Sequence, residues 1–245
     1  MKKLLALILF LGLSISGRGQ DIKVKYQFYL NDSLYYDKML YLGTDTSVWQ
    51  DYEETKLPNK ERTFVINNLK TNTQYSKHIV MMRENFISDT TFLAHQNWTL
   101  TPETKTLVGQ PCNSAETVFR EVRYKVFYAP NIPTQLGPWK FAGLPGLILE
   151  ARSLESVPLY HFVATEITNQ AAGGLTGLVN KLTKDKKWIS WDEYKIIFKK
   201  IIDNVANKIK SGGSLPVGAS TRIKLGMMEI IYPEAQTGEG LLIQN

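Results

Sequence analysis

The sequence has very little cysteine and histidine. Cys112 is its single cysteine, and 245 residues include only three histidines. One cysteine excludes an intramolecular disulfide, so packing alone has to hold the fold together, unlike in many small exported domains. Because free cysteine is among the most buried residue types, we expect Cys112 to be buried. His78, His95 and His161 stand far apart and match no metal-ligand spacing such as His-Glu-x-x-His, so we expect neither a metal nor a cofactor.

Familiar catalytic patterns are also missing. The sequence has no Gly-x-Ser-x-Gly elbow of a hydrolase. The glycine-rich segment 173–177 lacks the Gly-Lys-Ser/Thr ending of a phosphate-binding loop. Nothing next to Cys112 in the sequence would activate its thiol. The sequence therefore predicts no catalytic residue, although an unrecognised hydrolase that uses Cys112 or Glu150 with a histidine stays open as one alternative.

Long hydrophobic runs are absent except at the N-terminus. Residues 1–3 are short and basic, residues 4–13 are almost all apolar, and residues 14–19 are small and polar. This is the layout of a secretory signal peptide, and it is too short to span a bilayer, which takes about 20 apolar residues. We predict cleavage after Gly19 and a single mature domain over residues 20–245. The protein is then expected in the periplasm or at the outer-membrane surface.

Charge of one sign does not dominate. The chain has 29 basic and 23 acidic residues, for a net charge of +6. Lys2, Lys3 and Arg18 lie in the predicted signal peptide, which leaves 26 basic residues against 23 acidic ones. This excess is too small to predict nucleic-acid binding.

Alternating hydrophobicity predicts a β-rich domain. Residues 21–30 alternate polar and apolar side chains with a period of two, which is typical of a half-buried antiparallel strand. Asn31-Asp32-Ser33 then predicts a turn. We expect a loop over the charged residues 51–62 and a flexible break at 171–177. Further strands are predicted by β-branched and aromatic content at 38–42, 63–66, 76–83, 86–93, 98–100, 105–108, 117–128, 147–153 and 159–168, and more weakly at 221–225 and 228–232.

One helix is predicted, at residues 191–210. Ser190 and Glu193 form a capping box before it. Its apolar residues recur at helical spacing: Trp191, Tyr194, Phe198, Ile201, Ile202, Val205 and Ile209. The predicted fold is mainly β (α+β). It is an antiparallel sheet, curved or shaped as a half-barrel, with one late amphipathic helix packed on it.

The loop before residue 147 is stiff and aromatic. Leu144-Pro145-Gly146-Leu147 has the chemistry of a type II turn, with glycine at the position of positive φ. In an extended chain, Trp139 and Phe141 would point to the same side. They are either buried pegs that specify the fold or, with Lys140, an exposed ridge that binds a ligand; their density favours burial. Glu150 is either a ligand contact or, as we prefer, a solvent-facing strand residue. The residues assigned to the structural motif are Gly137, Pro138, Gly143, Leu144, Pro145, Gly146, Leu147 and Ile148.

The segment Gly-Leu-Pro-Gly-Leu-Ile-Leu-Glu, residues 143–150, resembles the signature of the bacterial GLPGLI family. Three earlier elements resemble the family in the same order: Gly109-Gln110-Pro111-Cys112, Val126-Phe127-Tyr128, and Ile-Pro-Thr-Gln-Leu-Gly-Pro at 132–138. Pro111 and Ala142 depart from the usual pattern. The resemblance implies an exported protein of the Bacteroidetes group, often encoded near outer-membrane TonB-dependent transporters, with no known reaction.

Three hypotheses of function follow. The first is a non-enzymatic exported protein that binds a partner or ligand, with a TonB-dependent transporter as the partner that the resemblance implies. The second is a carrier that holds a hydrophobic ligand in an apolar pocket under the helix. The third is the hydrolase named above. For the first two, the candidate binding residues are Trp139, Lys140, Phe141 and Glu150.

Overall fold

A computed structural model describes most of the chain after residue 20: residues 21–52, 62–80, 82–154, 159–170, 173–211, 220–223, 236–237 and 240–244. Twelve strands form one sheet in the order β12-β6-β5-β4-β3-β2-β1-β11-β10-β9-β8-β7. All neighbours are antiparallel except β12 and β6. The bounds are β1 Asp21–Leu30, β2 Ser33–Leu42, β3 Thr46–Asp51, β4 Phe64–Asn68, β5 Thr73–Val80, β6 Arg83–Asp89, β7 Thr99–Leu107, β8 Gln110–Phe119, β9 Val122–Ala129, β10 Leu147–Ser153, β11 Tyr160–Gln170 and β12 Trp188–Ser190.

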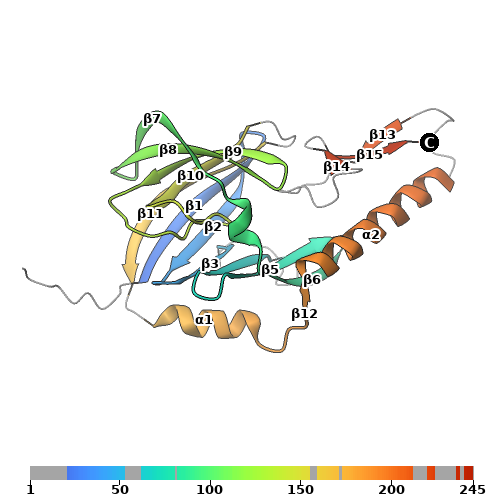
Figure 1. The fold of residues 1–245 in the computed structure, drawn as a ribbon, viewed down its shortest axis with the longest axis horizontal. Coiled ribbons are helices and arrows are strands. Elements are labelled where there is room, and N and C mark those ends of the chain that lie inside the picture. Colours follow the sequence, from blue (N-terminus) through green and yellow to red (C-terminus); the bar gives the residue numbers. More distant parts are fainter. Residues whose placement is uncertain are drawn as a thin grey trace, which may run out of the picture.

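The sheet is strongly curled (Figure 1). β4 and β8 stand seven positions apart in the strand order, which would separate them by roughly 34 Å in a flat sheet. Yet both contact Trp139: the Asn67 side chain of β4 donates a hydrogen bond to its carbonyl oxygen, and the Phe119 ring of β8 lies 5.4 Å from its ring. Asp89 at the end of β6 likewise forms an ion pair with Arg120, in the turn after β8. The sheet therefore wraps around the loop that carries Trp139.

Two helices pack on this sheet, α1 (Gly174–Thr183) on its outer face and the start of α2 (Trp191–Ser211) against His78 of β5 and the loop that carries Trp139. Leu175, Leu178 and Leu182 of α1 cover a cluster around Phe64 and Ile66. α2 follows β12 and buries Tyr194, Phe198 and Ile202, and its outer part extends away from the sheet (Figure 1). Within the described residues, neither helix combines the length and the apolar composition needed to cross a bilayer.

A second, three-stranded sheet lies near the C-terminus. Its strands are β13 (Ser220–Ile223), β14 (Gln236–Thr237) and β15 (Gly240–Gln244), and they pair with one another in the order β13-β15-β14. β13 overlaps the strand predicted at 221–225 over residues 221–223, whereas the strand predicted at 228–232 lies outside the described residues. The prediction of a single domain over residues 20–245 stays a prediction.

The main sequence predictions are confirmed. The protein is mostly β, with a curved sheet that does not close and a late helix packed on it. β10 occupies the predicted residues, and α2 begins at the predicted residue. The capping box forms as expected: the Ser190 amide donates to the Glu193 carboxylate at 2.7 Å, and the Glu193 amide donates to the Ser190 hydroxyl at 3.1 Å.

Several boundaries were predicted wrongly. Residues 117–128 form a hairpin rather than one strand, because Arg120 and Glu121 adopt positive φ values of 47° and 65°, a turn that their residue types do not announce. β3 was missed, and the strand predicted at 86–93 ends at Asp89, before a 3₁₀ turn at Phe92–His95. Instead of a flexible break at 171–177, α1 begins at Gly174, because its apolar face packs on the sheet.

The type II turn at residues 144–147 is also wrong. Gly146 does not have positive φ, whereas Gly143 does, at 95°. Gly146 is needed for space: a Cβ atom built on it would lie 2.5 Å from the carbonyl oxygen of Ala129. β10 therefore enters the sheet in close backbone contact with the end of β9, its neighbour.

We expect Gly146→Ala to destabilise the protein by about 2–4 kcal/mol, because the backbone of Ala129 cannot move without disturbing β9. Gly177→Ala in α1 is the control, since a Cβ there meets nothing within 4 Å; it should be neutral or stabilise by up to about 1 kcal/mol. Urea denaturation of the purified proteins measures both. Equal stability of the two variants would contradict the close approach of the Gly146 and Ala129 backbones.

Candidate ligand-binding site

The aromatic loop lies inside the curled sheet. Trp139 is 7% exposed and Phe141 is fully buried. The two rings meet edge to face, 5.1 Å apart, and both contact Tyr124 of β9. Trp139 has a φ of 54°, so this part of the loop is a tight turn, not the extended chain that we predicted. Of the two alternatives for this loop, the buried peg is correct and the exposed ridge is not.

A buried loop must satisfy its backbone polar groups without water. Here side chains from other segments do so. Asn67 of β4 donates to the Trp139 carbonyl at 2.9 Å. The Gln96 amide donates to the Lys140 carbonyl at 2.8 Å and accepts from the Ala142 amide at 2.6 Å. The Trp98 indole donates to the Ala142 carbonyl at 2.8 Å. These four hydrogen bonds fix the loop to β4 and to the segment between β6 and β7.

Lys140 is 1% exposed, so it does not form part of a surface ridge either. Its ammonium group lies 5.8 Å from the Trp139 ring centre and 5.1 Å from that of Trp191, the first residue of α2. The guanidinium of Arg120 also lies over the Trp191 ring, 3.4 Å from its centre. Cation–π contacts of this kind attract more strongly when they are desolvated. They hold the start of α2 against the loop.

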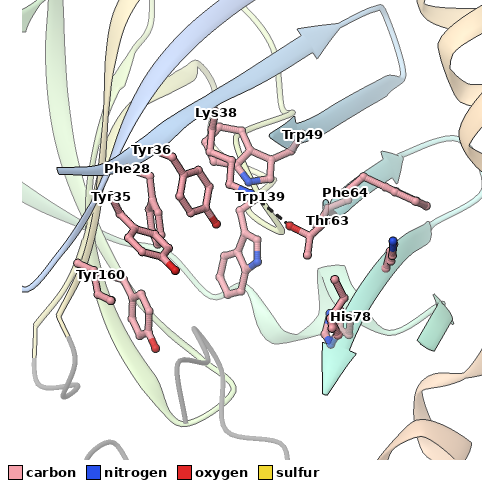
Figure 2. A pocket seen from close by; sticks show the side chains of 14 residues that line it. Phe28, Tyr35, Tyr36, Lys38, Trp49, Thr63, Phe64, His78, Trp139 and Tyr160 are labelled. Atoms are coloured by element: carbon pink, nitrogen blue, oxygen red, sulfur yellow. Dashed lines mark hydrogen bonds between the residues drawn. The ribbon is translucent and has the colours of Figure 1, made fainter. Parts of the chain in front are cut away.

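A cavity of about 320 Å³ lies between Trp139 and strands β1 to β5. Figure 2 shows Trp139 at its centre, with Phe28 and three tyrosines on one side and Thr63 and His78 on the other. Ligand pockets generally measure about 300–1,000 Å³ and are mostly apolar, with a few polar groups. We call this cavity the aromatic pocket. Its apolar lining residues are Phe28, Leu30, Tyr35, Tyr36, Trp49, Phe64, Val65, Ile79, Trp139 and Tyr160.

Lys38 supplies a charge to the wall of the aromatic pocket. Its ammonium forms a buried ion pair with Asp51, donates to the Thr63 hydroxyl at 3.3 Å, and lies 4.9 Å from the Tyr36 ring centre. Burial lowers the pKa of Lys38, although Asp51 counteracts part of this effect. The Thr63 amide also donates to Asp51 at 2.7 Å. Since these groups are bound to one another, the wall is polar but carries little net charge.

Tyr160 lines the aromatic pocket, but its hydroxyl is buried away from the cavity. Its side chain is 2% exposed, and its buried hydroxyl has no hydrogen-bond partner among the described residues. Burial raises the pKa of Tyr160, and burial together with the charge of Asp51 raises the pKa of Tyr36. Both phenols therefore stay protonated at neutral pH. The hydroxyl oxygen is itself shielded from the cavity, so Tyr160 contributes its ring, not a polar group, to the lining of the pocket.

The late helix touches the aromatic pocket only indirectly. His78 of β5 lines the pocket and makes a 3.1 Å hydrogen bond with the Tyr194 hydroxyl of α2, with the two rings edge to face. Among the described residues that line the pocket, none belongs to α2. The pocket of the carrier hypothesis is thus present, but it lies beside the aromatic loop rather than under the helix.

Glu150 lies outside the aromatic pocket, in a polar cluster. Its carboxylate forms an ion pair with Lys105 and lies 3.2 Å from Nε2 of His161. Tyr29 stacks on His161 with ring centres 5.5 Å apart. Burial by itself raises the pKa of Glu150, but the hydrogen bonds and positive charges of His161 and Lys105 outweigh it, so the pKa is lowered. The carboxylate is therefore firmly ionised at neutral pH and is a poor general acid.

The structure brings Glu150 and His161 together, so the hydrolase alternative is not removed by distance. Cys112 lies opposite Lys105 in the sheet register and is 2% exposed, as predicted. Burial raises the pKa of its thiol, although the Leu107 backbone and Lys105 counteract this, which disfavours the nucleophilic thiolate. Within the described part of the chain, no group of histidine, cysteine and carboxylate side chains could hold a metal ion.

A family model described as a protein of unknown function (Porph_ging) matches residues 49–150. The match begins at Trp49, which lines the aromatic pocket, and ends at Glu150, the last residue of the Gly-Leu-Pro-Gly-Leu-Ile-Leu-Glu segment. It covers less than half of the chain. No curated protein matches the sequence.

The crystal structure of PNGF-II in space group C2 resembles this fold, with a TM-score of 0.54 at 18% identity. The likeness covers 70% of this chain and 31% of PNGF-II, so the chain spans about a third of that protein. MucA/MucB from Pseudomonas aeruginosa gives a TM-score of 0.35 at 11% identity, covering 65% of this chain and 55% of that one. A LolA superfamily protein from Nitrosomonas europaea gives 0.26 at 8%, covering 63% and 87%. Only the likeness to PNGF-II is close enough to show a shared fold.

Sequence reasoning found one member of the aromatic pocket, Trp139, and missed the rest. Phe28 and Tyr160 belong to strands that the sequence did predict, whereas Tyr36 lies just before the strand predicted at 38–42. Their side chains share a face with other buried positions, and period-two alternation does not separate a residue that lines a cavity from one that fills the core. Lys38 carried a usable signal, since a charged residue in a predicted strand requires a partner wherever it is buried. Asp51 carried none, because the sequence placed it in a loop.

The pH dependence of stability tests the Glu150 cluster. A carboxyl group whose pKa is lowered in the folded state stabilises the fold at pH values above its pKa in the unfolded chain, which is about 4.5 here. This stabilisation is lost as the pH falls through the pKa of the folded state. Glu150→Gln should cost about 1–3 kcal/mol at neutral pH and reduce the loss of stability on acidification. Glu103 forms a more exposed ion pair with Lys125. Glu103→Gln should change the stability at neutral pH and the loss of stability on acidification by less than about 1 kcal/mol each. Parallel pH profiles of wild type and Glu150→Gln in urea denaturation would contradict the assignment.

Proposed function

We propose that this chain is an exported, non-enzymatic binding protein of the cell envelope, and that the aromatic pocket is its ligand site. Export is supported by the signal-peptide layout of residues 1–19. The observation that carries the binding site is the aromatic pocket itself, a cavity of about 320 Å³ lined mainly by aromatic and aliphatic side chains. This combines the two main hypotheses from the sequence, a binding protein and a carrier of a hydrophobic ligand.

Membership of the GLPGLI family is part of the proposal. It is supported by the signature at residues 143–150 and by the earlier elements in family order. The family resemblance in turn supports a place in the periplasm or at the outer-membrane surface, in a Bacteroidetes bacterium, with a TonB-dependent transporter as the candidate protein partner. To these points the structure adds only a candidate ligand site. It is the aromatic pocket, which the aromatic loop holds in shape.

The pocket is suited to binding rather than to catalysis. Its charged pair, Lys38 and Asp51, is satisfied internally, and the pKa values of Tyr36 and Tyr160 are raised, which removes them as bases. The rings offer apolar surface, and burying it contributes about 25 cal/mol per Å². A ligand held by these residues would be bound without being activated.

Titration with the apolar dye Nile red tests the pocket. We expect saturable fluorescence enhancement with the wild type. Ile79→Trp fills the pocket and should weaken dye binding by about ten-fold or more. Val118→Trp is the matched control, since Val118 is 58% exposed on β8 and does not line the pocket; it should leave dye affinity unchanged.

A folding defect in Ile79→Trp would show in its thermal unfolding curve, and Tyr35→Ala then provides the test. Tyr35 lines the pocket with 61% of its surface exposed, so its removal spares the core and should still weaken the dye several-fold. Absence of saturable enhancement in the wild type, or equal dye affinity in all variants, would refute the proposed site.

A further inference from the structure

A second cavity, of about 440 Å³, adjoins the aromatic pocket. Thr63, Phe64 and Lys77 line both cavities, so the two meet at the ends of β3, β4 and β5. The remaining walls of the second cavity come from β3, β6, α1 and the turn after α1. We call it the basic cavity, for the charges described next. In Figure 1, α1 lies below β3, which it contacts.

The basic cavity carries an excess of positive charge. Its charged lining residues are Arg62, Lys77, Lys181, Lys186, Asp51 and Glu84. Both carboxylates already have a lysine: Asp51 pairs with Lys38, and Glu84 pairs with Lys77 at 2.6 Å. Lys181 and Lys186 pair with no carboxylate among the described residues; the ammonium of Lys186 lies 4.8 Å from the Phe86 ring centre. The cavity is therefore complementary to an anion.

The junction between the cavities is also polar. Lys77 is 7% exposed and lies on the boundary, as does the hydroxyl-bearing Thr63. On one side of this boundary the walls are aromatic, and on the other they are basic. An uncharged apolar ligand would use the first side only, and a small inorganic anion would use only the second.

We infer that the ligand is an anionic amphiphile whose single apolar chain occupies the aromatic pocket and whose carboxylate or phosphate group lies in the basic cavity, near Lys181 and Lys186. The inference rests on the proposed function, since it requires the aromatic pocket to bind a ligand. A volume of about 320 Å³ is at the lower end of the range for ligand pockets, which favours one chain over a lipid with two.

Displacement of Nile red by ligands with the same chain and different head groups tests this inference. The probes are dodecanoate, dodecyl phosphate and uncharged dodecanol, each kept below its micellar concentration. At least one of the two anions should displace the dye at a concentration about ten-fold lower than dodecanol. The stronger of the two anions identifies the head group as carboxylate or phosphate.

Charge reversal then locates the head group. Lys181→Glu with Lys186→Glu should remove the advantage of the anions over dodecanol and leave Nile red affinity unchanged. The matched control is Lys195→Glu with Lys199→Glu on α2, two lysines that line neither cavity; it should keep that advantage, apart from the small screened effect of net charge.

The outcomes separate the two claims. If Nile red binds in the aromatic pocket but the anions and dodecanol displace it equally, or if the α2 control loses the anion preference as fully as the cavity variant does, the amphiphile is wrong and the pocket stands. If Nile red does not bind at all, the proposed function itself fails.

Discussion

The structure depends on a loop buried inside a curled sheet. Trp139 and Phe141 bring two large rings into the space that the curl creates, where they pack on Phe119 and Tyr124. A loop at this depth would ordinarily be costly, because each unpaired backbone group that loses water costs about 1–3 kcal/mol. Asn67, Gln96 and Trp98 remove that cost by supplying side-chain donors and an acceptor. The same bonds connect the loop to β4 and to the segment between β6 and β7, and Trp139 also packs on Phe119 of β8, so together these contacts hold the curl.

The aromatic pocket follows from the same loop. Trp139 fills the centre of the curled sheet but does not reach all of the surface presented by β1 to β5, and the remaining space is the cavity. Its walls are stiff, because the side chains belong to paired strands and Lys38 is bound to Asp51 and Thr63. α2 is connected to the same assembly twice, through Trp191 against Arg120 and Lys140, and through Tyr194 against His78. The loop therefore determines both the shape of the site and the position of the helix.

Local patterns predicted those parts of the protein that local physics decides. The alternation at residues 21–30 gave β1, and the capping box at Ser190 gave the start of α2. The strand at 147–153 was correct because Leu147 and Ile148 are buried whatever the loop does. The hairpin at Arg120 and α1 were missed because contacts with distant residues stabilise them against their local preferences. The requirement for glycine at position 146 was attributed to positive φ, whereas its cause is the close approach of Ala129, a residue distant in sequence. The pairing of Glu150 with His161 and the convergence of Tyr36, Trp139 and Tyr160 depend on the curl itself, which no local pattern encodes.

Amide hydrogen exchange of the aromatic loop, residues 137–143, tests the central claim most directly. The amides of Gly137 and Phe141 donate within the loop, Gly143 donates to Gln135 and Ala142 donates to Gln96. If the loop is held inside the sheet, these four amides exchange only through opening of the core, with protection close to that of the amides in β9 and β10. Exchange of the same amides at the rate of an exposed turn, while β9 and β10 stay protected, would contradict the account.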